Sequence, residues 1–212
     1  VGSLGALTSR TNSTLLPFLK TAWSGRTLAT ENAEAFRKRK VEAHRYRLAA
    51  VCGIQPANAG AILDDADGGF PQRFLWMPTY DPGMLPYDAE SPSAQPMHWT
   101  VPAAQIVVDE TAGTITWTGR QVMELPEAAV TAILEAAEAQ DRPIGAPAPA
   151  AAMDGHALLT RAKVAALLAL LDGRGTAVNE EDWALSGTVM AVSDATRAAI
   201  VKARSAEVAR AN

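Results

Sequence analysis

One stretch of the sequence restricts the fold more than any other. Residues 47–54, Arg-Leu-Ala-Ala-Val-Cys-Gly-Ile, form an apolar run of strand length that is followed by Gln55 and Pro56. A run that is apolar on both faces is typical of a central strand covered on both sides in an α/β sheet. A turn at residues 67–69 leads to a second strand candidate at residues 73–77, which Pro78 closes. We therefore predict the α/β class, with these two segments as neighbouring strands.

The rest of the sequence predicts mainly helices. We expect helices at residues 4–23, ended by Gly25, and at 32–44, 58–63, 126–140 and 154–171. Asn179 precedes three acidic residues and suits a helix N-terminus, and a final helix is predicted from Ser193 or Asp194 to about Ala209. Alternating residues predict a hairpin of 105–108 with 114–118, turning at 111–113.

Composition excludes several classes of protein. Of the 212 residues, 48% are hydrophobic and 20% charged, as in ordinary folded proteins, and the net charge of -4 excludes a basic field over the whole chain. No apolar run has the roughly 18 to 20 residues of a membrane span, and no signal peptide is visible. A single cysteine, Cys52, favours a reducing compartment. We expect a cytoplasmic protein that does not enter a membrane.

No complete catalytic site is visible. The phosphate-binding pattern G-x-x-x-x-G-K-[ST] is absent, and Gly68 and Gly69 precede a predicted strand where a phosphate cradle needs a helix. His44, His98 and His156 are scattered, so we predict no metal site. No nucleophile elbow frames a serine.

Three polar residues remain as candidates for a site. Gln55 follows the predicted central strand at its carboxyl end, where α/β sheets bind ligands, and the alternative is a structural strand cap. Arg73 opens the second strand and suits an arginine finger, or an ion pair with Asp64, Asp65 or Asp67. Arg161 lies on the predicted helix 154–171 as a lid arginine or as an exposed charge.

Basic residues cluster in one segment. Residues 37–40 read Arg-Lys-Arg-Lys, and His44, Arg45 and Arg47 follow. Such a cluster is able to contact a nucleic acid backbone, and a solvated helix face is the alternative.

Two blocks of sequence resemble a known family. Residues 46–56, ending in Gln-Pro, and residues 67–76, Asp-Gly-Gly-Phe-Pro-Gln-Arg-Phe-Leu-Trp, are similar to blocks of P-loop ATPases of the primase-helicase type from phages, prophages and plasmids. Segments at 9–17 and 22–25 resemble the helix region before the Gln-Pro strand of that family. The segments 156–163 and 178–183 are similar to the helical lids of replicative ATPases.

The resemblance implies a partial RecA-like P-loop ATPase sheet with flanking helices at residues 1–125, and an all-α lid or winged-helix-like bundle at 126–212. The phosphate-binding loop and the acidic strand for magnesium would precede Val1. Gln55 would then sense the nucleotide, Arg73 would be the finger, and Arg161 would contact the nucleotide from the lid.

The implied function is a fragment of an ATP-dependent DNA helicase of a mobile element. ATP and Mg²⁺ would bind the full-length protein, DNA and a homo-oligomeric ring would be its partners, and a primase domain would belong to the same polypeptide. The alternative is a non-catalytic DNA-binding or oligomerisation module of a replication protein. A degenerate ATPase that no longer hydrolyses ATP is a third possibility.

Overall fold

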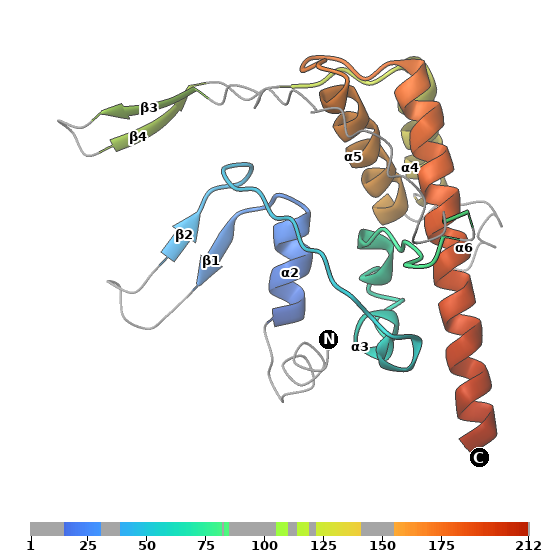
Figure 1. Ribbon diagram of the computed structural model, residues 1–212. Coiled ribbons are helices and arrows are strands. Elements are labelled where there is room, and N and C mark those ends of the chain that lie inside the picture. The colour runs from blue at the N-terminus through green and yellow to red at the C-terminus, as the bar shows by residue number, and fades with distance from the viewer. Residues whose placement is uncertain are drawn as a thin grey trace. The chain divides into compact units, whose positions relative to one another are not determined.

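The computed structural model describes residues 15–30, 39–81, 83–84, 105–109, 114–118, 122–140 and 155–211 (Figure 1). The chain divides into two compact units. The first unit comprises Val1–Phe74 and Arg197–Asn212, and the second comprises Leu75–Thr196. Helix α6, Glu180–Ala211, contributes residues to both units.

The predicted RecA-like sheet is wrong, because the described chain is mostly helical. Its strands form two separate antiparallel pairs, β1 (Leu28–Thr30) with β2 (Arg39–Val41) and β3 (Gln105–Asp109) with β4 (Thr114–Thr118). Residues 47–54 are irregular and mostly exposed, and Pro71–Arg73 is a turn of 3-10 helix followed by irregular chain. A strand exists only where a neighbour pairs with it, and no described strand pairs with either segment.

Several local predictions are confirmed. The pairing of β3 with β4 matches the predicted hairpin, whose turn lies outside the described residues. Helix α2, Leu15–Trp23, ends before Gly25, which has a φ of +69°. Helices α4, Glu127–Gln140, and α5, Gly155–Leu171, occupy the predicted positions. The helix expected at 32–44 is wrong where it is described, because Arg39–Val41 forms β2.

The first unit contains a small apolar core. Its buried members come from α2, from α3 (Gly60–Leu63) with the residue before it, and from the loop that follows, namely Ala22, Ala59, Ile62, Leu63 and Phe70. Two ion pairs tie this loop region to helices: Lys20 of α2 lies 2.6 Å from Asp65, and Arg204 of α6 binds Asp64. The helix predicted at 58–63 is shorter in the structure, where α3 begins at Gly60 after a 3-10 turn at Pro56–Asn58.

The second unit packs α4, α5 and the beginning of α6 around small residues. Its core consists of Ala129, Leu158, Ala165, Ala169, Val178 and Trp183. The alanines allow α4 and α5 to approach closely, and Trp183 of α6 belongs to the same cluster. The predicted cap is confirmed: Asn179 Oδ1 accepts from the Asp182 N–H at 2.8 Å, and Asp182 Oδ2 accepts from the Asn179 N–H at 2.9 Å.

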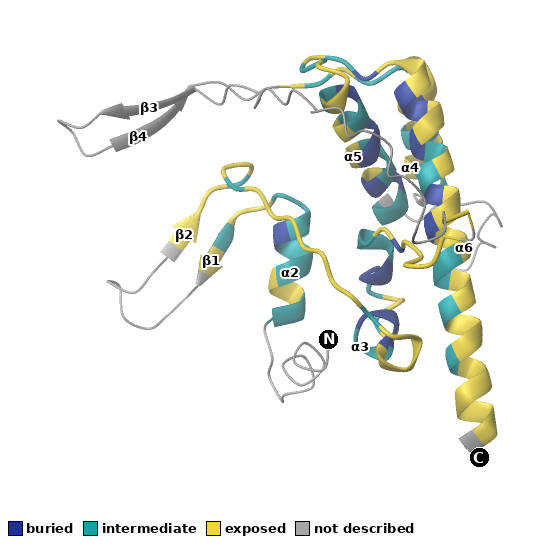
Figure 2. Ribbon diagram, in the orientation of Figure 1, coloured by how far each residue is buried: buried dark blue, intermediate teal, exposed yellow. Residues whose placement is uncertain are grey.

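Helix α6 is one continuous helix of 32 residues, so the separate final helix predicted from Ser193 is wrong. Ser193 lies within α6, fully buried, and its Oγ accepts a hydrogen bond from the Trp76 N–H at 2.9 Å. Ser186 is also buried, and its hydroxyl donates to the Trp183 carbonyl. Buried positions recur along the first half of α6, whereas its second half is largely exposed (Figure 2). Because polar residues such as Ser186 and Ser193 lie on the buried face of α6, the sequence pattern suggested a break between two helices.

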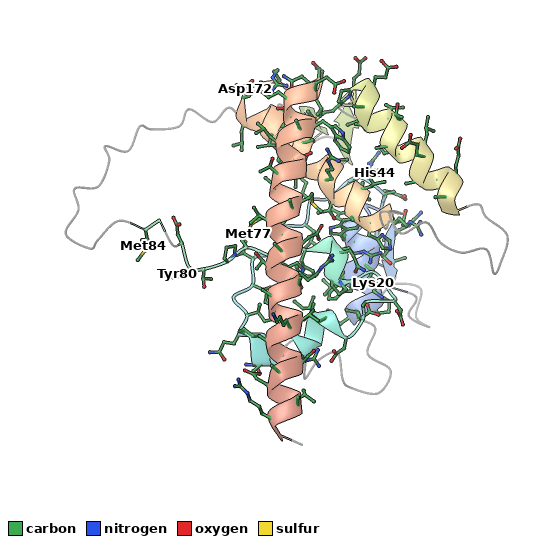
Figure 3. All side chains as sticks on the ribbon, turned by 90° about the vertical axis from the view of Figure 1, so that its right-hand side faces the viewer. Lys20, His44, Met77, Tyr80, Met84 and Asp172 are labelled. Carbon is green, nitrogen blue, oxygen red and sulfur yellow. The ribbon has the colours of Figure 1, made fainter. Side chains whose placement is uncertain are left out.

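Irregular chain follows Trp76 in the second unit. Met77, Tyr80 and Met84 are spread along this stretch as exposed side chains (Figure 3). Among the described residues, no helix is both long enough and apolar enough to cross a membrane.

Lowering the pH is expected to weaken the second unit through Asp182. The Arg174 guanidinium, which lies 2.6 and 2.8 Å from the two carboxylate oxygens, lowers the pKa of Asp182, and a hydrogen bond from the Asn179 N–H lowers it further. Because the pKa is lower in the folded state than in the unfolded state, the stabilisation is present above the unfolded value of about 3.9. It is lost as the pH falls through the folded value. Urea midpoints of the wild type and Asp182→Asn should differ at neutral pH and converge in acid.

Asp172→Asn is the matched control for this prediction. Asp172 binds the same guanidinium through Nε at 2.9 Å, but its side chain is 71% exposed, whereas that of Asp182 is 5% exposed. Exposed ion pairs contribute little, so Asp172→Asn should change the neutral midpoint much less. If the urea midpoint of Asp182→Asn stayed as far below that of the wild type in acid as at neutral pH, the carboxylate charge would not be the cause of the difference.

Candidate nucleic-acid interface

Gln55 lies in an exposed turn in place of the predicted sheet edge. It directly precedes the 3-10 helix Pro56–Asn58, and its Oε1 accepts a hydrogen bond from Asn58 Nδ2 at 3.2 Å. The strand that was to present Gln55 to a ligand is absent among the described residues. Gln55 therefore occupies a local turn and not the carboxyl end of a strand.

Arg73 is engaged inside its own loop. Its Nη1 donates to the carbonyl of Gly68 at 3.0 Å and to that of Gly69 at 2.6 Å. Its guanidinium also lies 5.2 Å from the centre of the Trp23 ring, which is a cation–π distance. These contacts hold the loop at 68–74 against α2. The ion pair with Asp64, Asp65 or Asp67 stays a prediction.

Arg161 stabilises the second unit. Its guanidinium lies 3.8 Å from the centre of the Trp183 ring, and Nη2 donates to the Trp183 carbonyl at 3.0 Å. Gly187 makes room for this arrangement, because a Cβ there would lie 3.1 Å from Nη2. Burial lowers the pKa of Arg161. Arg161 thus packs α5 onto α6, and it belongs to a different unit from Gln55 and Arg73.

Charge is distributed very unevenly between the two units. The first unit contains 14 Lys and Arg against 7 Asp and Glu, a net charge of +7. The second unit contains 5 Lys and Arg against 16 Asp and Glu, a net charge of -11. The total of -4 conceals this separation, because the basic residues come from both ends of the chain. A basic field of this kind attracts polyanions to the first unit.

The β1–β2 hairpin carries a large share of the positive charge. Residues 26–47 contain seven Lys and Arg and three Glu. The side chains of Arg26, Arg45 and Arg47 are exposed, and none of them forms an ion pair within the described part of the chain. Lys40 on β2 pairs with Glu42 at 2.8 Å, and Lys40 and Arg45 lower the pKa of that carboxyl. This segment therefore keeps a net positive charge at neutral pH.

The base of the hairpin is held to the end of α2. The Tyr46 hydroxyl lies 2.6 Å from the Arg26 carbonyl oxygen and 3.1 Å from that of Ala22. The Tyr46 hydroxyl is a donor in these hydrogen bonds, and burial raises its pKa. The His44 N–H donates to the Gly25 carbonyl at 2.9 Å, with His44 in the left-handed region at φ 61°. The basic flanks of the hairpin are therefore positioned by hydrogen bonds.

Sequence reasoning identified the basic residues but assigned them to the wrong element. The run at 37–40 was expected on a helix, and the structure places Arg39–Val41 in β2, paired in register with Leu28–Thr30. Strands of three residues leave almost no periodic signal. The charge of residues 1–74 and 197–212, taken together, was a signal that the whole-chain total hid.

The described residues offer no metal centre, since no group of three or more His, Cys, Asp or Glu among them is placed to hold an ion. Comparison of the chain with protein-family models, with curated proteins and with solved structures gives no significant match.

Proposed function

We propose that this chain is a non-catalytic DNA-binding module, and that the β1–β2 hairpin with its flanks is its contact surface. The separation of charge carries the proposal: a unit of +7 adjoins in sequence a unit of -11. DNA phosphates attract the first unit and repel the second, so the charge pattern favours contact with DNA through the first unit.

The hairpin has a shape that suits DNA. The major groove of B-DNA, about 12 Å wide, admits a two-stranded β-ribbon, and basic side chains that flank the ribbon reach the phosphates. Arg26 precedes β1, and Arg45 and Arg47 follow β2, so the base of the antiparallel ribbon carries exposed guanidinium groups on both of its chains. Guanidinium binds phosphate oxygens through two parallel hydrogen bonds.

The ATPase interpretation loses its structural premise. It requires a sheet whose carboxyl edge presents Gln55 beside a strand that begins at Arg73, and the described residues contain only two separate hairpins. The contacts of Arg73 and Arg161 are those of residues that hold a fold together. ATP, Mg²⁺ and a helicase ring remain predictions from the sequence.

Fluorescence anisotropy with a labelled duplex of about 20 base pairs tests the proposal. We expect binding whose logarithmic affinity falls linearly with the logarithm of the salt concentration, with a slope of about -3 for three to four phosphate contacts. Affinity without sequence preference is expected in the range of about 10⁻⁴ to 10⁻⁶ M near physiological salt. Failure to bind at low salt, or binding that salt does not weaken, would contradict it.

A further inference from the structure

Residues 47–54 combine properties that are rarely found together on a protein surface. They are apolar from Leu48 to Ile54, yet the chain between β2 and α3 is largely exposed (Figure 2). Val51 has an exposed fraction of 102%. Their backbone N–H and C=O groups make no hydrogen bond to any described residue. The sequence has the composition of a strand, and no described segment pairs with it.

The β3–β4 hairpin, in turn, has no third strand among the described residues. Its five residue pairs, from Gln105↔Thr118 to Asp109↔Thr114, use one edge of each strand. In the described part of the chain, no further strand pairs with the outer edge of either of them. A two-stranded hairpin is marginally stable in water, and a third strand is the usual remedy.

We propose that residues 47–54 of one copy add as a third strand to the outer edge of β4 in a second copy of this chain. β4, Thr-Ile-Thr-Trp-Thr, contains β-branched and aromatic residues and no charge. Residues 48–55 are also uncharged, so no ionic group opposes the pairing. β3 is the poorer acceptor because it ends at Asp109.

A second copy is the occupant because every copy carries both halves of the interaction. When each copy donates residues 47–54 and accepts the same segment at β4, the two contacts are related by a two-fold axis and the assembly closes as a dimer. The backbone hydrogen bonds of strand addition provide the affinity. Pairing two 47–54 segments with each other would instead give another isolated two-stranded ribbon. The proposal does not depend on DNA binding.

Disulfide trapping between two differently tagged chains tests this directly, since Cys52 is the only cysteine. The donor chain keeps Cys52, and the acceptor chain carries Cys52→Ser with one new cysteine at positions 114 to 118. We expect a mixed disulfide dimer at alternate acceptor positions only, Thr114, Thr116 and Thr118 or else Ile115 and Trp117, because side chains alternate between the faces of a strand. The geometry of a disulfide excludes the other face.

Proline variants of the donor provide the control. Ala50→Pro and Val51→Pro each remove one N–H, and adjacent N–H groups point to opposite edges, so at least one of the two variants should abolish the mixed dimer. Val122→Pro makes the same change at a 75% exposed residue outside the segment and should leave the mixed dimer intact. Sedimentation equilibrium should show a dimer for the wild type and for Val122→Pro, and a monomer for the disrupting variant.

Three outcomes would overturn the proposal. These are a monomeric wild type at all concentrations, cross-linking that does not alternate along β4, and cross-linking that survives both proline changes. A disulfide that forms only within one chain, when Thr116→Cys is introduced beside native Cys52, would also exclude the second copy as the occupant.

Discussion

Replacing Trp183 with alanine is expected to lower the free energy of unfolding of the second unit by about 3 to 5 kcal/mol, the usual loss for a large aromatic residue in a core. The Trp183 side chain is 5% exposed and packs in the core with Leu158 and Val178. Its ring also faces the Arg161 guanidinium at 3.8 Å. Truncation removes the apolar contacts and leaves a partly buried guanidinium without its aromatic partner. Urea denaturation followed by circular dichroism at 222 nm measures the loss.

Two further variants separate packing from helix propensity. Leu185→Ala makes a large-to-alanine change on the same helix, but Leu185 is 47% exposed, so its effect should stay below about 1 kcal/mol. Trp183→Phe keeps an aromatic face for Arg161 and should fall between alanine and the wild type. If Leu185→Ala destabilised the protein as much as Trp183→Ala, the assigned core would be incorrect.

What the sequence predicted well was local. Helix α5 and the Asn179 cap depend on residues within one or two turns of each other, and both appear where the sequence places them. The end of α2 at Gly25 is of the same kind, because a positive φ is a property of one residue.

What the sequence predicted badly depends on distant partners. An apolar run such as residues 47–54 becomes a buried strand only if other segments cover it and pair with it, and its own residues cannot report whether they do. The prediction of a separate helix beginning at Ser193 was wrong for a related reason. Ser193 resembles a helix cap in the sequence, whereas in the structure it receives the Trp76 N–H from 117 positions away.

The candidate site shows the same division between local and distant information. The sequence identified Arg73 as important, but the carbonyls of Gly68 and Gly69 that bind it became evident only from the loop conformation. The sequence also identified the basic run, while the strand pairing that forms the hairpin, and the union of both chain ends in one basic unit, required the fold.

Reversing the charge of Arg45 and Arg47 together should weaken DNA binding by about two orders of magnitude at moderate salt and reduce the slope of the salt dependence by about 2. Both side chains are exposed and lie in the chain that follows β2, so glutamate there would remove two proposed phosphate contacts and add two repulsive charges. Neither side chain belongs to a core, so the double variant Arg45→Glu, Arg47→Glu should fold normally. Anisotropy titrations of a 20-base-pair duplex at several salt concentrations, about 50 to 200 mM, give both quantities.

The double variant Lys202→Glu, Arg210→Glu distinguishes a local contact from the overall field. Lys202 and Arg210 are exposed on α6 in the same unit, so this change alters the net charge of the unit by the same amount without touching the hairpin. A hairpin that contacts phosphates predicts a much smaller loss here, with the salt slope nearly that of the wild type, because long-range attraction is screened within about 10 Å at 0.1 M salt. If both double variants weakened binding equally, the first unit would attract DNA only through its total charge, and the β1–β2 hairpin would not be the contact surface.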